Sequence, residues 1–374
     1  MANLLQTIVN SIYSDYVMNQ SLSKGDRLPT VRELRKRYNT SGTTIVHALS
    51  VLEEQGVIEK RHGVGCYIAD GPRQEFHASY RMLGLIVQNE SSELPMRVYR
   101  GVESIRQRFD YNVMIADGSD SYDAERAEVQ RMINSGCQAI ILYPALRTPE
   151  QLANDYLKTD FKDFPIVLVD LAFREQGRSQ IMFDNYRAGY EMTEMLLNDG
   201  HQHVAFALCN STNSHLIVKS NAERHRGYMD ALRMARVEAR PEDEWLIEGF
   251  DAGNDVLIDL LMKWKETKDR PTALVALEDK MATNVTHIAK ELGVSVPDEL
   301  EVVGFDNLVY GQSCRPSFPT TDPDFVRAGA LAVEIALEHI SGHLKEPITY
   351  MLPAPIVLRT GRISPRIRDE QLVN

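Results

Sequence analysis

The stretch "TVRELRKRYNTSGTTIVHALSVLEEQGVIEKRHGVGCYI", residues 30–68, contains the pattern that decides the fold of the N-terminal part of the chain. Thr30 and Glu33 have the Thr-x-x-Glu spacing of a capping box, in which each side chain accepts a hydrogen bond from the other residue's backbone amide. This spacing predicts a short helix that ends near Tyr38. A second helix follows it closely, so the two predict a helix-turn-helix.

The second helix is expected to begin after Ser41, a suitable N-cap residue, and to stop at Gly56. Its buried side is defined by apolar side chains at helical spacing: Ile45, Ala48, Leu49 and Leu52. The other side of its first turns carries mostly small or polar side chains: Gly42, Thr43, Val46 and His47. A surface with so little bulk can approach another molecule closely.

Two further elements complete the N-terminal part. Upstream, apolar residues at helical spacing predict a helix over about residues 3–19: Leu5, Ile8, Ile12 and Tyr16. Downstream, "VIEKRHGVGCYI", residues 57–68, is typical of two short strands around a glycine turn. Helix, helix-turn-helix and hairpin together predict a winged helix-turn-helix over residues 1–70.

Charge is distributed unevenly along the chain. The net charge is -12, yet residues 1–70 contain eight Lys/Arg and seven Asp/Glu, whereas the remainder contains 33 and 46. The bases of the N-terminal part form two clusters: Arg32, Arg35, Lys36 and Arg37, then Lys60 and Arg61. Such clusters attract phosphates, although a solvated helix face would explain the first cluster equally well.

Residues 25–68 resemble the DNA-binding domain of the GntR family, with counterparts of its LPS-x-RELA, S-R-x-TV and Gly-rich wing patterns. The resemblance implies that the second helix enters the major groove of double-stranded DNA and that the wing reaches the minor groove. It implies the following DNA contacts: Arg32, Ser41, Gly42, Thr43, Thr44, His47, Arg61, His62 and Gly63. Gly42 stands where the family usually has arginine, which implies that a guanine-reading contact is missing.

A different pattern begins after residues 71–81, where Gly-Pro and the lack of apolar periodicity predict a linker. From Met82, short apolar runs such as "MLGLIV", "AIILY" and "HVAFAL" alternate with helical stretches near 123–135, 186–198 and 280–292. Strands separated by helices of this length are typical of parallel sheets covered on both faces. Residues 82–374 are therefore expected to have an α/β fold with two parallel doubly wound sheets, hence two lobes.

Ligands bind beyond the carboxyl ends of the strands in folds of this kind. Polar residues occupy those ends: Gln88, Asn89, Asp117, Asp170, Asp184, Asn185, Glu278, Asp279, Asp306 and Asn307. Aromatic residues follow nearby: Phe173, Phe183, Phe250 and Tyr310. Carboxylates accept pairs of hydroxyls and rings cover a C–H face, so this set predicts a polyhydroxylated ligand.

Residues 82–362 resemble the effector domain of the LacI/GalR family, itself similar to periplasmic sugar-binding proteins, through pieces such as "FPIVLVD", "ERHRGYMDAL", "PTALVALEDKMA", "GVSVPDELEVVGFDN" and "LPAPIVLRTG". The resemblance places ligand-binding residues at Arg224 and Asp306. Glu278 stands where the family often has asparagine, which implies a ligand that presents only donors there, or a cation. The expected effector contacts are Asn89, Asp170, Phe173, Asp184, Arg224, Phe250, Glu278 and Asp306.

Structural roles are the alternatives for these residues, since a helix-start salt bridge would explain Arg224 and capping would explain Asp184 or Asp306. Neither a catalytic triad nor a phosphate loop appears, so we expect no enzyme and no cofactor. The four cysteines lack ligand spacing and His201-Gln-His203 matches a family turn, so no metal is expected. No apolar run could cross a membrane and the start lacks a basic region, which favours the cytoplasm.

The two resemblances together imply a transcription regulator, a repressor of carbohydrate-use genes that a sugar bound between the lobes releases from its operator. A homodimer on a pseudo-palindromic operator is expected, because one helix-turn-helix buries too little groove for useful specificity. Alternatives are control by a nucleoside or purine, control by a protein partner, and a sugar-modifying enzyme with a regulatory DNA-binding head.

Overall fold

The chain forms two compact units, Met1–Met82 and Leu83–Asn374, each of which is described by itself. The computed structural model describes residues 8–9, 11–13, 15–16, 22–23, 25–54, 56–61, 64–69, 81–89, 92–109, 111–170, 177–210, 219–248 and 254–359. The predicted linker, apart from Arg81, lies outside these residues.

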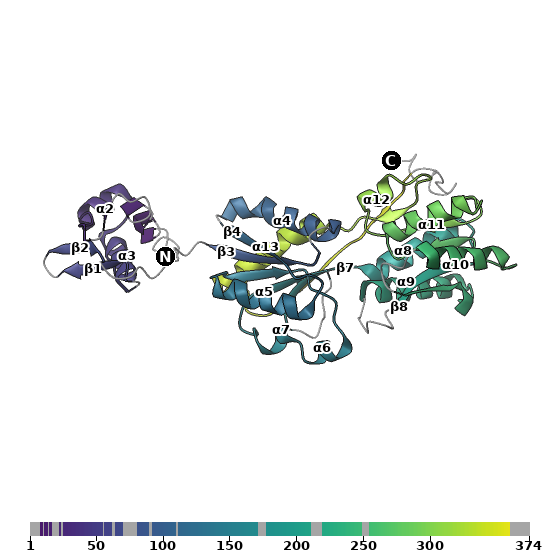
Figure 1. Ribbon diagram of the computed structural model, residues 1–374, viewed down its shortest axis with the longest axis horizontal. Coiled ribbons are helices and arrows are strands. Elements are labelled where there is room, and N and C mark those ends of the chain that lie inside the picture. The colour runs from purple at the N-terminus through teal and green to yellow at the C-terminus, as the bar shows by residue number, and fades with distance from the viewer. Residues whose placement is uncertain are drawn as a thin grey trace. The chain divides into compact units, whose positions relative to one another are not determined.

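The N-terminal unit has the helix-turn-helix and the hairpin that the sequence predicts (Figure 1). Helix α2 (Val31–Arg37) begins with the expected capping box, because Thr30 and Glu33 accept each other's backbone amides. Helix α3 (Gly42–Glu54) follows, and strands β1 (Ile58–Arg61) and β2 (Gly65–Ile68) pair antiparallel. Their apolar sides share one core with residues 8–9 and 12 of the predicted first helix, whose other parts lie partly outside the described residues.

The first lobe of the larger unit is built around a six-stranded sheet with the order β13-β7-β6-β5-β3-β4. Its strands are β3 (Met82–Val87), β4 (Asn112–Asp117), β5 (Ala139–Leu142), β6 (Ile166–Val169), β7 (Ser179–Phe183) and β13 (Thr349–Leu352). Its helices are α4 (Glu93–Phe109), α5 (Tyr122–Asn134), α6 (Pro149–Ala153), α7 (Tyr156–Thr159) and α13 (Phe325–Ser341). Strands β5 and β6 are buried along their whole length, as expected for parallel strands covered on both faces.

The second lobe contains a four-stranded sheet with the order β11-β10-β8-β9. Its strands are β8 (Val204–Asn210), β9 (Glu244–Glu248), β10 (Ala273–Val275) and β11 (Glu301–Val303). Its helices are α8 (Asn185–Asn198), α9 (Lys219–Ala235), the 3-10 turn η3 (Pro241–Asp243), α10 (Asn254–Glu266), α11 (Asp279–Glu291) and α12 (Val309–Gln312). The short strands β12 (Thr320–Thr321) and β14 (Ile356–Val357) pair antiparallel where the chain passes between the lobes (Figure 1).

Close helix packing fixes two helix pairs. At Gly189 of α8 an added Cβ atom would lie 2.1 Å from the carbonyl oxygen of Arg224 on α9, and at Gly227 it would lie 2.1 Å from that of Tyr186. Gly101 of α4 and Gly329 of α13 meet their partner helices in the same way. Backbone contact of this kind sets the position of α9, which carries Arg224.

Candidate functional site

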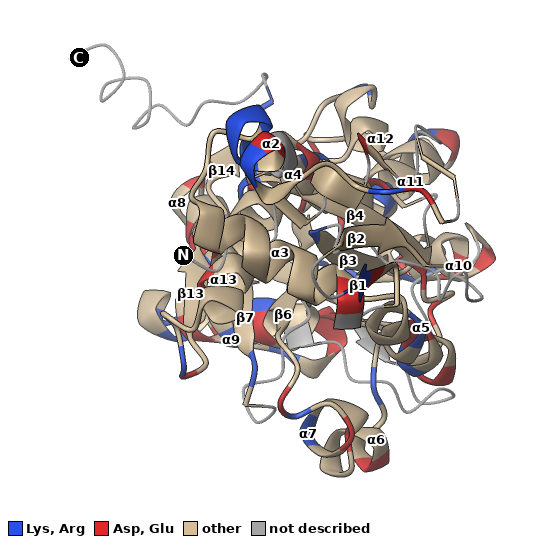
Figure 2. Ribbon diagram, turned by 90° about the vertical axis from the view of Figure 1, so that its left-hand side faces the viewer, with Lys and Arg blue, Asp and Glu red and all other residues tan. Residues whose placement is uncertain are grey.

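The exposed side of α3 is the first candidate site. Thr43, Val46 and His47 are exposed, while the opposite side of the helix lies in the core. Figure 2 shows α3 uncharged along most of its length, beside a basic segment of α2 at residues 35–37. The exposed side of α3 therefore has the mostly small or polar side chains that the sequence predicts. Ser41 stays a predicted DNA contact, and its hydroxyl caps α3 by accepting from the Thr44 amide at 3.1 Å.

The basic residues of this unit fall into two groups. Arg37 pairs with Asp15 at 2.8 Å, Lys60 pairs with Glu53 at 2.6 Å, and Arg61 pairs with Glu59. By contrast, Arg32, Arg35 and Lys36 are exposed on α2 and form no ion pair within the described part of the chain. These three cations are available to a polyanion, and Arg32 is the one among them that is a predicted DNA contact.

The wing is described only in part. Arg61 lies over the ring of Tyr67, with its guanidinium carbon 4.2 Å from the ring centroid, so its stem is held on the hairpin. His62 and Gly63, the predicted minor-groove contacts, lie outside the described residues.

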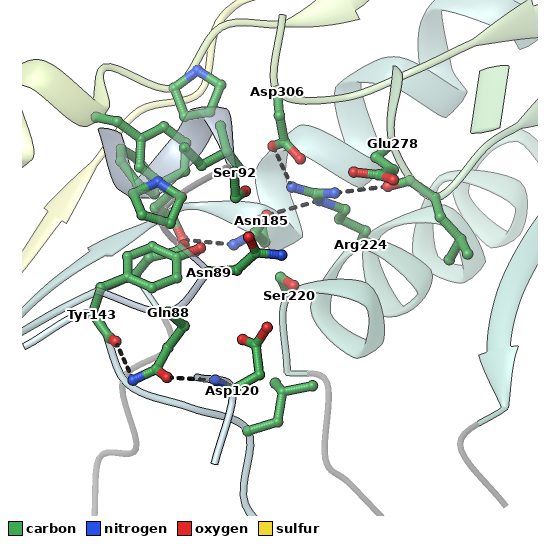
Figure 3. Close-up of a pocket in the computed structure, with 18 residues that line it drawn as sticks. Gln88, Asn89, Ser92, Asp120, Tyr143, Asn185, Ser220, Arg224, Glu278 and Asp306 are labelled. Carbon is green, nitrogen blue, oxygen red and sulfur yellow. Dashed lines mark hydrogen bonds and ion pairs between the residues drawn. The ribbon is translucent and has the colours of Figure 1, made fainter. Parts of the chain in front are cut away.

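A cavity of about 300 Å³ in the larger unit is the second candidate site (Figure 3). Its polar lining consists of Gln88, Asn89, Ser92, Asp120, Tyr143, Asp170, Asn185, Ser220, Arg224, Glu278 and Asp306. Its apolar lining consists of Leu94, Pro95, Leu146, Phe183, Leu277, Pro323 and Phe325. Both lobes contribute, and the cavity lies at the carboxyl ends of β3, β6, β7, β10 and β11, the position expected for a ligand.

Arg224 is a cavity residue of the second lobe whose side chain is held by hydrogen bonds to its neighbours. Its guanidinium donates to Asn185 Oδ1 at 2.8 Å, to the Leu277 carbonyl at 2.9 Å and to Asp306 Oδ1 at 2.7 Å (Figure 3). It also lies over the ring of Phe305. Asp306 is 6% exposed and Arg224 is 8% exposed, so the two form a largely buried ion pair.

Two cavity carboxyl groups have raised pKa values. Burial, then the like charge of Asp306, raises the pKa of Asp170 to about 6, although Tyr143 donates to its carboxylate at 3.0 Å. Burial and Asp306 likewise raise the pKa of Glu278 to about 7. Outside the cavity, burial raises the pKa of Asp279 to about 6, although Thr320 and Arg359 donate to it.

Positive backbone φ angles cluster at the cavity. Asn89, Asp120, Asp170 and Asp306 have φ values of 54°, 51°, 69° and 83°. Non-glycine residues seldom adopt this conformation, although asparagine and aspartate tolerate it better than most. Each of these residues follows the end of a strand, so the turn aims its side chain across the sheet edge.

The structure brings together five of the predicted effector contacts: Asn89, Asp170, Arg224, Glu278 and Asp306. Asp184 does not line the cavity. Its carboxylate caps α8 by accepting from the Arg187 amide at 3.0 Å, which was the alternative role for this residue. Phe173 and Phe250 lie outside the described residues.

The predicted set missed several cavity residues. Tyr143 directly follows β5, so strand-end position could have found it. Asn185 and Gln88 were named among the polar strand-end residues but not among the expected effector contacts. Gln88 lies between the buried Glu125, to which it donates at 2.9 Å, and the backbone of Asp120, from which it accepts at 3.0 Å. Ser220, at the start of α9, carries no sequence signal of this kind.

Two residues of α4 connect the lobes beside the cavity. Arg97 donates to the Asp306 carbonyl at 3.1 Å and to the Asn307 carbonyl at 2.6 Å. Glu93 holds Arg97 at 2.6 Å and accepts from the Val309 amide at 2.9 Å. The first lobe therefore contacts the loop that carries Asp306 through its backbone.

The raised pKa values predict a pH dependence of stability. A carboxyl group whose pKa is higher in the folded than in the unfolded state stabilises the folded state when it is protonated. This stabilisation is complete below the unfolded pKa and is lost as pH rises through the folded pKa. For Asp170, Asp279 and Glu278 this window runs from about pH 4 to about pH 7. We expect the melting temperature of Glu278→Gln and Asp170→Asn to fall less than that of the wild type between pH 5 and pH 8. An equal fall in melting temperature between pH 5 and pH 8 for all three proteins would contradict this.

Comparison with known families finds two separate matches, one in the N-terminal unit and one in the larger unit. Residues 8–68 match the family described as "Bacterial regulatory proteins, gntR family", and residues 193–360 match the "Periplasmic binding protein-like domain". The chain therefore joins a GntR-type winged helix-turn-helix to a two-lobed periplasmic-binding-protein-like domain, as the sequence resemblances predicted.

The chain is also similar to two proteins that are named as regulators. The chain is 24% identical over 324 residues to the arabinose metabolism transcriptional repressor of Halalkalibacterium halodurans, covering 86% of this chain and 85% of that protein. It is 26% identical over 283 residues to catabolite control protein A of Priestia megaterium, covering 74% and 80%. The larger unit's fold is that of a sugar-binding transcriptional regulator (LacI family) from Escherichia coli, with a TM-score of 0.62 at 21% identity over 76% and 99% of the two chains.

No helix in the described part of the chain is both long and apolar enough to cross a membrane.

Proposed function

We propose that this protein is a transcriptional repressor of sugar-use genes, and that a sugar effector bound between its two lobes releases it from operator DNA. The single observation that supports this most is the cavity itself. It places amides, carboxylates, one arginine and aromatic rings from both lobes around a space at the lower end of the usual volumes for small-molecule sites. Residues 1–70 form the DNA-binding head, 71–81 the linker, and 82–374 the effector domain.

The contacts of α4 could couple effector binding in the cavity to a change in the relative position of the two lobes. An effector that bonds to Arg224 and Asp306 competes with their mutual ion pair and acts on the loop that Arg97 and Glu93 hold. The effector then favours the lobe arrangement that it binds more tightly, and the population shifts according to the difference between its affinities for the two arrangements. In a homodimer this shift changes the spacing of the two heads and lowers operator affinity.

The test uses the full-length protein and an operator selected from random duplex DNA. A gel-shift titration is expected to show tight binding whose affinity falls steeply with salt, because bound phosphates release counterions. Addition of one sugar from a panel of pentoses, hexoses and disaccharides is expected to release the DNA. Release by a purine or nucleoside in place of every sugar would reassign the effector, and turnover of the bound sugar would show an enzyme.

Gly42 provides a prediction about base reading. An added Cβ atom at Gly42 would meet no atom within 4 Å beyond its own stretch of α3, so the position is open to a side chain. Gly42→Arg is expected to add a guanine or phosphate contact and to change the preferred operator by about 1 to 3 kcal/mol per contacted base pair. Selection from random DNA measures the change, with Gly42→Ala as the control that should keep the wild-type consensus. The same consensus for wild type and arginine variant would place residue 42 away from the groove.

A further inference from the structure

The described residues of the cavity lining carry more negative than positive charge. Among the described residues that line it, the carboxylates are Asp120, Asp170, Glu278 and Asp306, and the guanidinium is Arg224. Arg224 already pairs with Asp306 at 2.7 Å, so its charge is matched before any ligand binds. The surplus of acceptors and negative charge favours a ligand that brings donors and a positive charge.

One of these carboxylates differs from the others in its surroundings. Asp306 receives the guanidinium of Arg224, Asp170 receives the hydroxyl of Tyr143, and Asp120 has interactions of its own. The Glu278 side chain receives no hydrogen bond within the part of the chain that the structure describes, and although it precedes α11 it does not cap that helix. Glu278 is therefore the cavity carboxylate that lacks a donor.

The charges around Glu278 leave it incompletely compensated. Burial is the main cause that raises the pKa of Glu278 to about 7. Asp306 and Asp279 raise this pKa further, whereas Lys280, exposed on α11, and Arg224 lower it. A partly buried carboxylate in this state gains from a cationic hydrogen-bond donor, because the pair replaces lost hydration.

The remaining lining suits hydroxyl groups and a sugar ring. Asn89, Asn185 and Ser220 offer amide and hydroxyl groups between the two ends of the cavity (Figure 3). Phe183 and Phe325 supply apolar surface from the first lobe. A simple aliphatic amine has no hydroxyl groups with which to bond to these amide and hydroxyl groups.

We propose that the effector is an amino sugar, whose protonated amino group is held by Glu278 while its hydroxyls bond to the surrounding amides and to Arg224. This inference rests on the proposed function, since it names the class of sugar for the same cavity.

Calorimetry on the full-length protein at pH 7 tests it with three sets of probes. These are glucosamine, galactosamine and mannosamine, then glucose, galactose and mannose, then the N-acetyl forms, which keep the bulk but not the charge. At least one amino sugar is expected to bind about ten- to a hundredfold more tightly than its parent hexose and its N-acetyl form, as a charge-assisted hydrogen bond provides.

Two variants test whether the preference for an amino sugar depends on Glu278. Glu278→Gln keeps the size of the side chain and removes its charge, so it is expected to lose the preference for the amino sugar over its parent hexose. Glu291→Gln, an exposed position on the same helix, is expected to keep the preference. Melting curves confirm folding, and Glu278→Asn serves as a second variant if the first does not fold.

Different outcomes overturn different conclusions. Tight binding of a neutral sugar without preference for its amino form, or a preference that survives in Glu278→Gln, overturns the inference and leaves the sugar-responsive repressor standing. A wild-type protein that binds no sugar in this set or in the broader panel overturns both.

Discussion

Arg224→Met is expected to hold operator DNA at effector concentrations that release the wild-type protein. Arg224 donates to Asn185, to the Leu277 carbonyl and to Asp306, and all three bonds end in the cavity wall. Loss of its charge-assisted bonds to the ligand, worth about 1.5 to 3 kcal/mol each, weakens effector binding roughly ten- to several-hundredfold. Effector calorimetry and an operator gel shift on the same protein measure the two halves of this expectation.

Because Arg224 and Asp306 form an ion pair, Arg224→Met is also expected to lower the stability of the protein, which the sequence did not predict. Without Arg224, Asp306 stays largely buried and loses its counter-charge, which costs about 3 to 5 kcal/mol when a buried pair is broken on one side. The double variant Arg224→Met/Asp306→Asn is expected to recover part of that stability without recovering the effector response. Arg226→Met is the matched control, because Arg226 lies exposed on the same helix and pairs with Glu223. Loss of operator binding in Arg224→Met would make this residue structural, and normal release by effector would place the ligand elsewhere.

Arg147→Met is expected to lower the free energy of unfolding by about 3 to 5 kcal/mol. Arg147, Glu125 and Asp155 are all fully buried, and the arginine pairs with both acids. Its removal leaves two buried carboxylates without a cation. Urea unfolding followed by circular dichroism measures the loss, which corresponds to a fall in melting temperature of roughly 6 to 15 °C.

Two further variants separate charge from packing at this cluster. Arg126→Met removes an exposed arginine that pairs with Asp160, so it is expected to change stability by less than about 1 kcal/mol. Arg147→Met combined with Glu125→Gln and Asp155→Asn is expected to recover part of the loss, because the uncompensated charges are gone. An equal loss in both arginine variants would show that the buried cluster contributes no more than a surface pair.

Much of the fold could be predicted from the sequence, because strong local patterns coincide with its elements. The Thr30 capping box, the apolar stripe of α3 and the runs that became β3, β5 and β6 are confirmed. Strands such as β9, with the sequence EWLIE, were missed because charged ends and short length hide the pattern. Residues 8–68 match the gntR family and residues 193–360 match a periplasmic-binding-protein-like domain, in agreement with the two resemblances.

The candidate site was only partly predictable. Strand-end position selected Asp170, Glu278 and Asp306 correctly as cavity residues, since parallel strands bring their ends to one edge. The same rule selected Asp184, because a cap and a ligand contact look alike in sequence. That Arg224 and Asp306 bond to each other depends on contacts across 82 positions of sequence, which no local pattern reports.

The contact between α4 and the Asp306 loop has a consequence for engineering. Arg97 binds the carbonyl oxygens of Asp306 and Asn307, and these atoms are the same whatever side chain occupies the two positions. Side chains that choose the ligand can therefore change while the link between the lobes persists. A biosensor library randomised at Glu278 and Asp306, with Glu93 and Arg97 kept, would explore new inducers while retaining the transmission of the signal.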